Sequence, residues 1–292
     1  MTVGVLGVGR MGLPVARRFL AAGRDVLAVD PDPVRVGLAV AAGARRSTPD
    51  AVAGQVDVLV TVLPGADEVP AVTPTLEHLR PGSVWLDLTS ADPRTTNAIA
   101  GRLDAGVVGA AMGGGPADAR EGSLDLFVGG PEPDVQQVLP LLRDLSGNGG
   151  SMRHVGAQPG AGQLVKLLAN LLWFNQSLAV TESLLLARAA GLDVRGVREA
   201  LAGSAGDSEF LRRHVDHLLR GDYLRHFGVD RVVEELDVLA EVAREAGTPY
   251  DVGRLVTRLH HETLERFGPV DGELLAARLL EERGGGPLHE GS

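Results

Sequence analysis

Short apolar runs rich in β-branched residues alternate with helical patterns in the first half of the chain. The segments 11–23 and 33–43 carry apolar residues at helical spacing, and each ends in a glycine, as helices often do. The apolar runs predict strands at 3–8, 25–30, 56–63, 83–88, 106–112 and 124–130. Strands that are apolar almost throughout are typical of a parallel sheet covered by helices on both faces. We therefore predict a doubly wound α/β domain over residues 1–158.

The second half of the chain is almost wholly helical in its pattern. It begins with a long apolar run from about 159 to 190, which would form a helix of roughly 45 Å at 1.5 Å per residue. Because leucines cover most faces of this helix, we expect it to be buried at a domain or subunit interface. We predict an all-α domain over 159–283 and a disordered tail at 284–292. The further helices are predicted at 193–202, 207–219, 228–246, 249–266 and 271–283.

Composition narrows the classes of function. The net charge of −10 argues against a nucleic-acid-binding protein, which would normally present a basic face. The absence of cysteine excludes disulfides, thiolate zinc sites and cysteine nucleophiles. No apolar stretch reaches the ~18 residues of a membrane helix, and the first residues show no basic leader. We expect a cytoplasmic globular protein without a membrane or nucleic-acid partner.

A glycine-rich turn follows the first predicted strand and opens the first helix. It has the pattern GxGxxG and consists of Gly7, Val8, Gly9, Arg10, Met11 and Gly12. Glycines in such a turn allow a tight bend, close approach of the backbone to a pyrophosphate, and close packing of helix on strand. The N-terminus of the helix adds amide donors and a favourable dipole for phosphates. We interpret the segment as the dinucleotide-binding loop of a Rossmann domain.

The second predicted strand ends in a carboxylate, Asp30, eighteen residues beyond Gly12. A carboxylate at this place can accept hydrogen bonds from both ribose hydroxyls of the adenosine and would repel a 2′-phosphate. The nearest arginine in the sequence that could favour a 2′-phosphate is Arg35. We predict NAD as the cofactor, with NADP less favoured.

Three further motifs follow in a fixed order: Thr61-Val62-Leu63-Pro64, Asp87-Leu88-Thr89-Ser90, and Gly160-Ala161-Gly162-Gln163-Leu164-Val165-Lys166 with Asn170. Together with the glycine-rich turn they resemble the β-hydroxyacid dehydrogenases, which include 3-hydroxyisobutyrate dehydrogenase and tartronate semialdehyde reductase. The resemblance extends from the first strand to about residue 283, and GxGxxxKxxxN is its most specific part. It implies a Rossmann domain joined by the long helix to an all-α domain like that of 6-phosphogluconate dehydrogenase.

The resemblance also implies roles for individual residues. Lys166 would be the catalytic acid/base and Asn170 a catalytic ligand of the substrate. Residues four apart lie on one face of a helix, so these two side chains project toward the same point. Lys166 is the only lysine of the chain, and an arginine could not release its proton in this role. By the same resemblance, the residues on the nicotinamide side of the cofactor are Leu63, Pro64, Thr89 and Ser90.

The predicted substrate loop departs from the family pattern. Where the family usually has Asp-Ala-Pro-Val-Ser-Gly-Gly, this chain has Gly-Ala-Ala-Met-Gly-Gly-Gly over residues 109–115. The leading aspartate and the serine hydroxyl are therefore missing. Backbone amides of glycines can still hold a carboxylate or similar anion. We predict that the substrate-binding residues of this loop are Met112, Gly113, Gly114 and Gly115.

A second departure follows Phe227. The family commonly has Lys-Asp-Leu where this chain has Glu234-Glu235-Leu236, so a positive charge has become negative. The substrate can carry a neutral or positive group at this end, Arg231 can replace the missing cation, or the pocket can be remodelled for another carbonyl or an imine. We favour a changed substrate with the same hydride chemistry. Trp173, two turns beyond Lys166, is a further candidate for the pocket wall or for the core or interface.

The sequence thus predicts an NAD(P)-dependent dehydrogenase or reductase acting on a CH–OH group. The substrate would be a small hydroxy acid or the corresponding semialdehyde or keto compound. Two alternatives stay open: an imine reductase on the same fold, which Lys166 and Asp30 oppose, and a catalytically silent cofactor-binding protein. Histidine pairs in the predicted helices lack a third ligand, so we expect no metal. The long apolar helix leads us to expect a homodimer or homotetramer.

Overall fold

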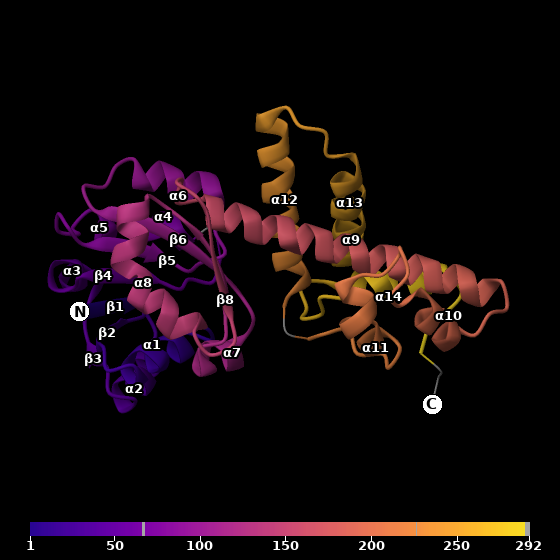
Figure 1. Ribbon diagram of the computed structural model, residues 1–292, viewed down its shortest axis with the longest axis horizontal. Coiled ribbons are helices and arrows are strands. Elements are labelled where there is room, and N and C mark those ends of the chain that lie inside the picture. Colours follow the sequence, from indigo (N-terminus) through magenta and orange to yellow (C-terminus); the bar gives the residue numbers. More distant parts are fainter. Residues whose placement is uncertain (66–67, 226, 290–292) are drawn as a thin grey trace. The chain divides into compact units, whose positions relative to one another are not determined.

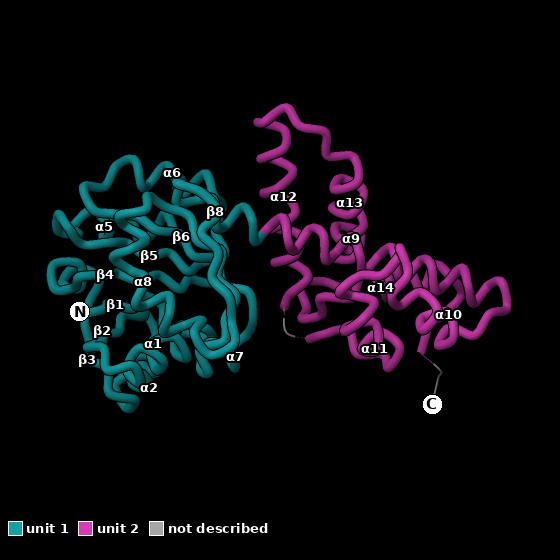
Figure 2. Tube along the Cα trace, viewed as in Figure 1, with its two compact units in different colours: residues 1–166 teal, residues 167–292 magenta. Residues whose placement is uncertain are grey.

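The computed structural model describes residues 1–65, 68–225 and 227–289 (Figure 1). The chain divides into two compact units, Met1–Lys166 and Leu167–Ser292 (Figure 2). The division falls inside a single helix, α9 (Ala161–Ala189), which contributes to both units. The predicted domain boundary at 158/159 lies at the start of that helix rather than within it.

Unit 1 is built on one sheet with the strand order β3-β2-β1-β4-β5-β6-β7-β8. All neighbouring strands are parallel except β6 and β7. The chain first runs from β1 outward to β3 and then returns to β4 beside β1, so the order reverses at the carboxyl ends of β1 and β4, where α/β sheets bind their ligands. The strands are β1 (Thr2–Leu6), β2 (Asp25–Val29), β3 (Arg45–Arg46), β4 (Val58–Thr61), β5 (Val84–Asp87), β6 (Gly106–Gly113), β7 (Asp125–Gly129) and β8 (Ser151–Gly156).

Helices cover both faces of this sheet, which confirms the predicted doubly wound α/β architecture. Side chains alternate along a strand: Val58 and Val60 pack with α1, α2, α7 and α8, whereas Leu59 packs with α3, α4, α5 and α6. The helices are α1 (Gly12–Ala21), α2 (Pro33–Ala41), α3 (Pro49–Val52), α4 (Glu68–Ala71), α5 (Thr73–Leu76), α6 (Pro93–Ala100), α7 (Pro116–Glu121) and α8 (Glu132–Ser146).

Three features of the sheet differ from the prediction. Strands β3 and β8 were not predicted, because β3 has only two residues and the middle of β8 is exposed rather than apolar. Strand β7 runs antiparallel to β6, so the sheet is not wholly parallel. Hydrophobic patterning shows that a segment is buried in a sheet, but it does not encode the direction of its neighbours.

Unit 2 is helical and packs around α9. One core joins Phe174 and Leu178 of α9 to Leu236, Val256 and Leu280 of three other helices. A second core joins Leu184 of α9 to the π-helical turn Phe210–His214 and to α11. The predicted helix at 207–219 is therefore split into that turn and α11. The helices of unit 2 after α9 are α10 (Val194–Leu201), α11 (Val215–Leu218), α12 (Val229–Ala246), α13 (Asp251–Phe267) and α14 (Leu275–Arg283).

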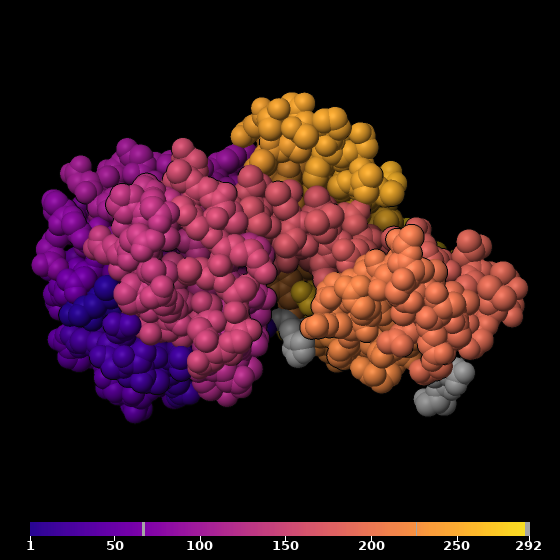
Figure 3. Space-filling view, in the orientation of Figure 1, coloured from indigo at the N-terminus to yellow at the C-terminus, as the bar shows by residue number. Residues whose placement is uncertain are grey.

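Part of α9 remains on the surface of the single chain. Leu172 and Leu186 are 61% and 72% exposed, and side chains of this helix are visible along the surface of unit 2 (Figure 3). The expectation that α9 lies at an interface rests on these leucines and stays a prediction. Among the described residues, no helix has the length and apolar character needed to cross a membrane.

The predicted disordered tail is wrong for residues 284–289, which pack on unit 2. Leu288 is buried, and its backbone N–H donates to Glu281 Oε1 at 2.7 Å. Arg188 at the end of α9 donates to the carbonyl oxygens of Gly284, Gly286 and Pro287 at 2.5–3.0 Å. The glycine-rich composition suggested disorder because these partners are distant in sequence. Residues 290–292 lie outside the described part of the chain.

A buried histidine in unit 2 makes the stability of the protein depend on pH. His260 of α13 packs against the ring of Phe174, with 5.1 Å between the ring centroids. Its Nδ1–H donates to the Val256 carbonyl at 2.9 Å, and Nε2 is buried without a partner among the described residues. Burial lowers the pKa of His260 to about 4 from an ordinary value of 6.5. The folded state therefore favours the neutral form of the imidazole ring.

We expect acid to destabilise the protein through His260. Because the pKa of His260 is lowered in the folded state, its contribution to the free energy of unfolding is fully present above pH 6.5. This contribution is lost as the pH falls toward 4. Between pH 7 and pH 4.5 the loss should be about 2 to 3 kcal/mol, measured by urea unfolding. A His260→Leu variant should lack this part of the pH dependence, whereas His261→Asn, at a neighbour that is exposed, should keep it. Equal pH dependence in both variants would contradict the assignment.

Candidate active site

The glycine-rich turn joins β1 to α1 at the point where the strand order reverses. Gly7 has a φ of +91°, and a Cβ there would lie 2.3 Å from the Val62 carbonyl oxygen. A Cβ on Gly12 would lie 1.8 Å from the Gly7 carbonyl oxygen. Backbone thus packs directly on backbone, and only glycine fits at either place. Val8 is buried, Gly9 and Met11 are half-buried, and Arg10 is exposed.

Asp30 holds the same turn from the end of β2. Its Oδ2 accepts the Val8 backbone N–H and its Oδ1 accepts the Asp32 backbone N–H, both at 2.9 Å. The guanidinium of Arg35 lies 4.0 Å from Asp30 Oδ1, and this arginine is half exposed. The carboxylate is therefore fixed beside the glycine-rich turn, where the adenosine ribose of a dinucleotide would be expected.

The two loops predicted to face the nicotinamide lie next to each other. They follow the neighbouring strands β4 and β5, and the backbone N–H of Leu63 donates to Thr89 Oγ1 at 3.1 Å. Thr89 is buried and Leu63 half-buried, whereas Pro64 and Ser90 are exposed. The structure thus brings together segments that are 26 residues apart in the sequence.

The start of α9 is docked on α6 and on the sheet through two glycines. A Cβ on Gly160 would lie 2.3 Å from the Pro93 carbonyl oxygen, and one on Gly162 would lie 2.2 Å from the Phe127 carbonyl oxygen. The backbone N–H of Gly160 also donates to Asn97 Oδ1 at 2.8 Å. The helix therefore begins in close contact with α6 and β7. Lys166 is on the second turn of this helix and is half-buried.

Two buried residues of this region belong to the family motifs but were given no individual role from the sequence. Asp87, at the end of β5, is fully buried and accepts a hydrogen bond from Gln163 in the first turn of α9 at 3.2 Å. Burial raises the pKa of Asp87, although hydrogen bonds from Thr89 and Thr61 partly offset that effect. In the sequence, the only indication of this role was a carboxylate at the end of an apolar strand. Its hydrogen-bond partners lie in other segments of the chain, so the sequence pattern does not reveal them.

The predicted substrate loop follows β6. Met112 and Gly113 are the last paired residues of that strand, opposite Leu126 and Asp125. Gly114 has a φ of +107°, and the backbone N–H of Gly115 donates to Asp118 Oδ2 at 2.7 Å. The Gly115 amide therefore caps α7, so it already has an acceptor other than a substrate anion. The binding role of this loop stays a prediction.

The charged residues of α12 form two contacts within unit 2. Arg231 Nη1 lies 2.8 Å from Glu234 Oε2, so the charges of this pair offset each other. Asn170 Nδ2 of α9 donates to Glu235 Oε2 at 2.5 Å, and Glu235 is buried. The side chain of Asn170 thus meets a carboxylate, which the sequence analysis did not predict.

Trp173 belongs to the helical core. Its ring makes edge contacts with Phe174, Phe210 and His214, with centroids 5.5–6.0 Å apart. These contacts favour the core alternative over a role in the pocket wall. No group of three or more potential metal ligands occurs in the described ranges, although His214 and His217 do stack on each other.

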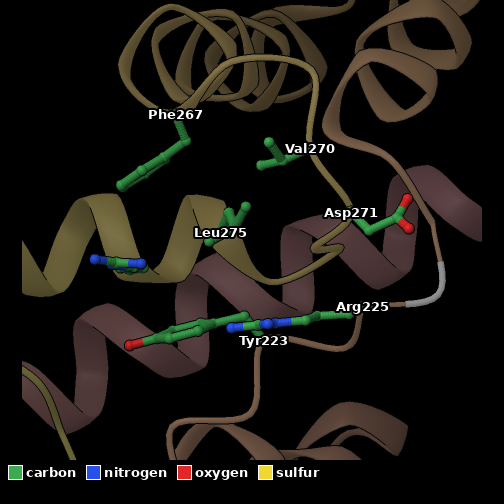
Figure 4. A pocket seen from close by; sticks show the side chains of 7 residues that line it. Tyr223, Arg225, Phe267, Val270, Asp271 and Leu275 are labelled. Atoms are coloured by element: carbon green, nitrogen blue, oxygen red, sulfur yellow. The ribbon is translucent and has the colours of Figure 1, made fainter.

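A cavity of about 410 Å³ in unit 2 is lined by none of the predicted site residues. It lies among Tyr223, Arg225, Phe267 and Arg278 at the start of α14 (Figure 4). The guanidinium of Arg278 already stacks on both rings, 5.8 Å from Tyr223 and 5.1 Å from Phe267. The cavity therefore does not contribute to the candidate active site.

Two family profiles together cover most of the chain. Residues 2–156 match the NAD-binding domain of 6-phosphogluconate dehydrogenase. Residues 160–280 match the profile described as NAD-binding of NADP-dependent 3-hydroxyisobutyrate dehydrogenase. The boundary between the two profiles precedes α9.

Two curated relatives illustrate the likeness in sequence. L-threonate dehydrogenase of Escherichia coli is 27% identical over 256 residues, which are 85% of this chain and 84% of the relative. Probable 3-hydroxyisobutyrate dehydrogenase of Mycobacterium tuberculosis is 32% identical over 212 residues, which are 70% of each chain.

Solved structures share the fold. That of 3-hydroxyisobutyrate dehydrogenase from Mycobacterium tuberculosis with L-serine has a TM-score of 0.85 at 24% identity, covering 95% of this chain and 98% of the other. That of an imine reductase from Streptomyces aurantiacus has a TM-score of 0.60 at 22% identity, covering 96% and 99%. The fold is thus common to both kinds of enzyme, whereas the two sequence relatives described above are named as dehydrogenases. The chain belongs to the β-hydroxyacid dehydrogenase family, whose members are NAD(P)-dependent dehydrogenases acting on a CH–OH group.

Proposed function

We propose that the chain transfers a hydride between NAD and a small hydroxy compound, or the corresponding aldehyde or keto compound, with Lys166 as general acid/base. The observation that carries this proposal is the docking of the start of α9 on α6 through Gly160, and on the sheet through Gly162 and the Gln163–Asp87 hydrogen bond. The helix that carries Lys166 is thereby tied to Thr89 of the predicted nicotinamide loops.

The chain's own residues have distinct tasks in this proposal. The amides at the start of α1 bind the pyrophosphate, and Leu63 and Thr89 orient the nicotinamide ring. When bound, the cofactor accepts the hydride in oxidation and supplies it in reduction. In oxidation the neutral amine of Lys166 takes the hydroxyl proton as the C–H bond breaks; in reduction the ammonium returns a proton to the carbonyl oxygen. Asn170 orients the substrate on the same helix face.

The location of Asp30 supports NAD over NADP. The carboxylate is held at the glycine-rich turn by two backbone amides, and each oxygen retains capacity for a ribose hydroxyl. A 2′-phosphate at this place would meet like charge. Arg35 is near enough to attract such a phosphate, but it lies beside both Asp30 and Asp32.

We expect kcat/KM for NADH to exceed that for NADPH by roughly tenfold or more, a difference of about 1.4 kcal/mol. Asp30→Asn should reduce the ratio because it removes the repulsive charge. Arg35→Ala is the matched control and should leave the preference for NADH in place. A higher kcat/KM with NADPH that falls in Arg35→Ala would show that Arg35 binds a 2′-phosphate and would overturn the choice of NAD.

Replacing Lys166 tests the acid/base role. With semialdehydes, keto acids and cyclic imines as a panel, Lys166→Ala should lower kcat for an aldehyde or keto acid by roughly a hundredfold or more. Lys166→Arg should lose as much, because arginine keeps the charge but does not release its proton. NADH binding, measured by fluorescence titration, should be unchanged in both variants. Full activity of Lys166→Ala, or turnover of imines alone, would favour the imine reductase alternative.

The substrate itself is proposed to differ from that of typical family members. The lysine that usually lies near the substrate carboxylate is Glu234 here, and the charge of Arg231 is paired with it. The carboxylate of Glu235 is buried against Asn170. Arg231 and Glu234 offset each other, and the carboxylate of Glu235 beside Asn170 favours a neutral or positive substrate group over a carboxylate. The hydride chemistry would remain the same.

A charge reversal at Glu234 tests this choice. Glu234→Lys restores the family residue and should raise kcat/KM for a carboxylate-bearing hydroxy acid, relative to its amide analogue, by on the order of tenfold. Glu241→Lys on the same helix is the matched control, because Glu241 is half exposed and pairs with Arg244. Wild-type turnover of 3-hydroxyisobutyrate and serine above that of all non-acid alcohols would contradict the changed substrate.

A catalytically silent cofactor-binding protein is the remaining alternative. It would bind NADH and turn over no member of the panel. The docking of α9, which carries Lys166, argues against this alternative. A protein that only binds a dinucleotide does not require an acid/base on α9.

A further inference from the structure

The carboxylate of Asp87 is the meeting point of four segments of unit 1. Oδ1 accepts the Thr61 hydroxyl at 2.8 Å and the Thr89 backbone N–H at 3.0 Å. Oδ2 accepts the Gln163 side-chain amide at 3.2 Å and the Thr96 hydroxyl at 3.3 Å. The side chain of Asp87 is fully buried, so these donors replace water around the charge.

Two of these segments belong to the candidate active site. Thr89 accepts the Leu63 backbone N–H, so Asp87 supports both loops that are predicted to face the nicotinamide. Gln163 precedes Lys166 by three residues, which places the two side chains on neighbouring turns of α9. A single carboxylate thus links the cofactor loops to the helix of the acid/base.

The surroundings are shaped to admit the Gln163 side chain. Gly109 of β6 leaves the space, because a Cβ there would lie 2.4 Å from Gln163 Oε1. That oxygen is buried and has no hydrogen-bond partner among the described residues. The contact with Asp87 is therefore the polar interaction that orients this amide. Burying a carboxylate is costly, so a purely structural link would be made more cheaply by neutral groups.

We propose that Asp87 is a positioning residue of the hydride-transfer site, which holds the Leu63–Thr89 loops and the first turn of α9 in one arrangement. This inference rests on the proposed role of Lys166. Asp87 acts through Gln163 on the lysine helix and through Thr89 on the cofactor loops. It does not itself touch the substrate.

Gln163→Met and Thr96→Val form the matched pair of variants. Each removes one donor to the same oxygen of Asp87 and keeps the size of the side chain, but only Gln163 lies on the helix that carries Lys166. We expect kcat of Gln163→Met to fall on the order of tenfold, because Lys166 shifts, while KM for NADH stays unchanged. Thr96→Val should keep kcat within about threefold of wild type, because neither loop nor lysine moves.

Two controls separate positioning from a general loss of stability. In a Lys166→Ala background, Gln163→Met should have little further effect on kcat, because residues that act through one another are not additive. Hydrogen exchange of the amides of residues 161–166 should increase in Gln163→Met and not in Thr96→Val. Asp87→Asn keeps the shape but presents an NH₂ group to a donor, so it should lose at least as much kcat as Gln163→Met.

The outcomes test the positioning role of Asp87 and the proposed function separately. Equal kcat in Gln163→Met and Thr96→Val, additive effects with Lys166→Ala, or full activity of Asp87→Asn would overturn the positioning role. If Lys166→Ala alone retains activity, the proposed function fails instead. In that case, or if no substrate is turned over, the exchange of residues 161–166 still decides whether Asp87 holds this turn.

Discussion

Direct packing of backbone on backbone is the constraint on which the candidate site depends. At the start of α1 and at the start of α9, a Cβ on the glycine would lie 1.8–2.3 Å from a backbone carbonyl oxygen of a neighbouring strand, turn or helix. Because no side chain separates the elements, the helix that would bind the pyrophosphate and the helix that carries Lys166 are both fixed to unit 1. In the sheet, β4 and β5 lie between β1, which leads into α1, and β7, on which α9 begins.

Much of unit 1 could be predicted from the sequence because its elements are strongly patterned. The apolar strands and the glycine-rich turn are local features, and they were found where they were expected. Features that depend on pairing were missed: β8 is an exposed edge strand, and β7 reverses direction beside β6. The tail at 284–289 was missed for the same kind of reason, because Arg188 holds it from almost a hundred residues away.

The candidate site was predictable only as far as spacing determines it. A separation of four residues on one helix places Lys166 and Asn170 on one face. The contacts that orient such residues come from elsewhere in the chain: Glu235 is 65 residues from Asn170, and Asp87 is 76 residues from Gln163. Sequence patterning therefore indicates candidate residues for the chemistry, while the fold determines the charges that surround them. The carboxylate of Glu235 beside Asn170 is an example of a charge that the fold brings to the candidate site.

The packed end of the chain has a consequence for the order in which the protein folds. Unit 1 is a continuous stretch from residue 1 to 166, so all of its strands are available once that stretch has been synthesised. Unit 2 differs, because the last turn of α9 is held by Arg188 contacts to residues 284–287 and Leu288 completes its core. Those residues are synthesised long after residue 166. The nucleotide-binding unit can therefore fold before the helical unit has all the residues that its packing requires.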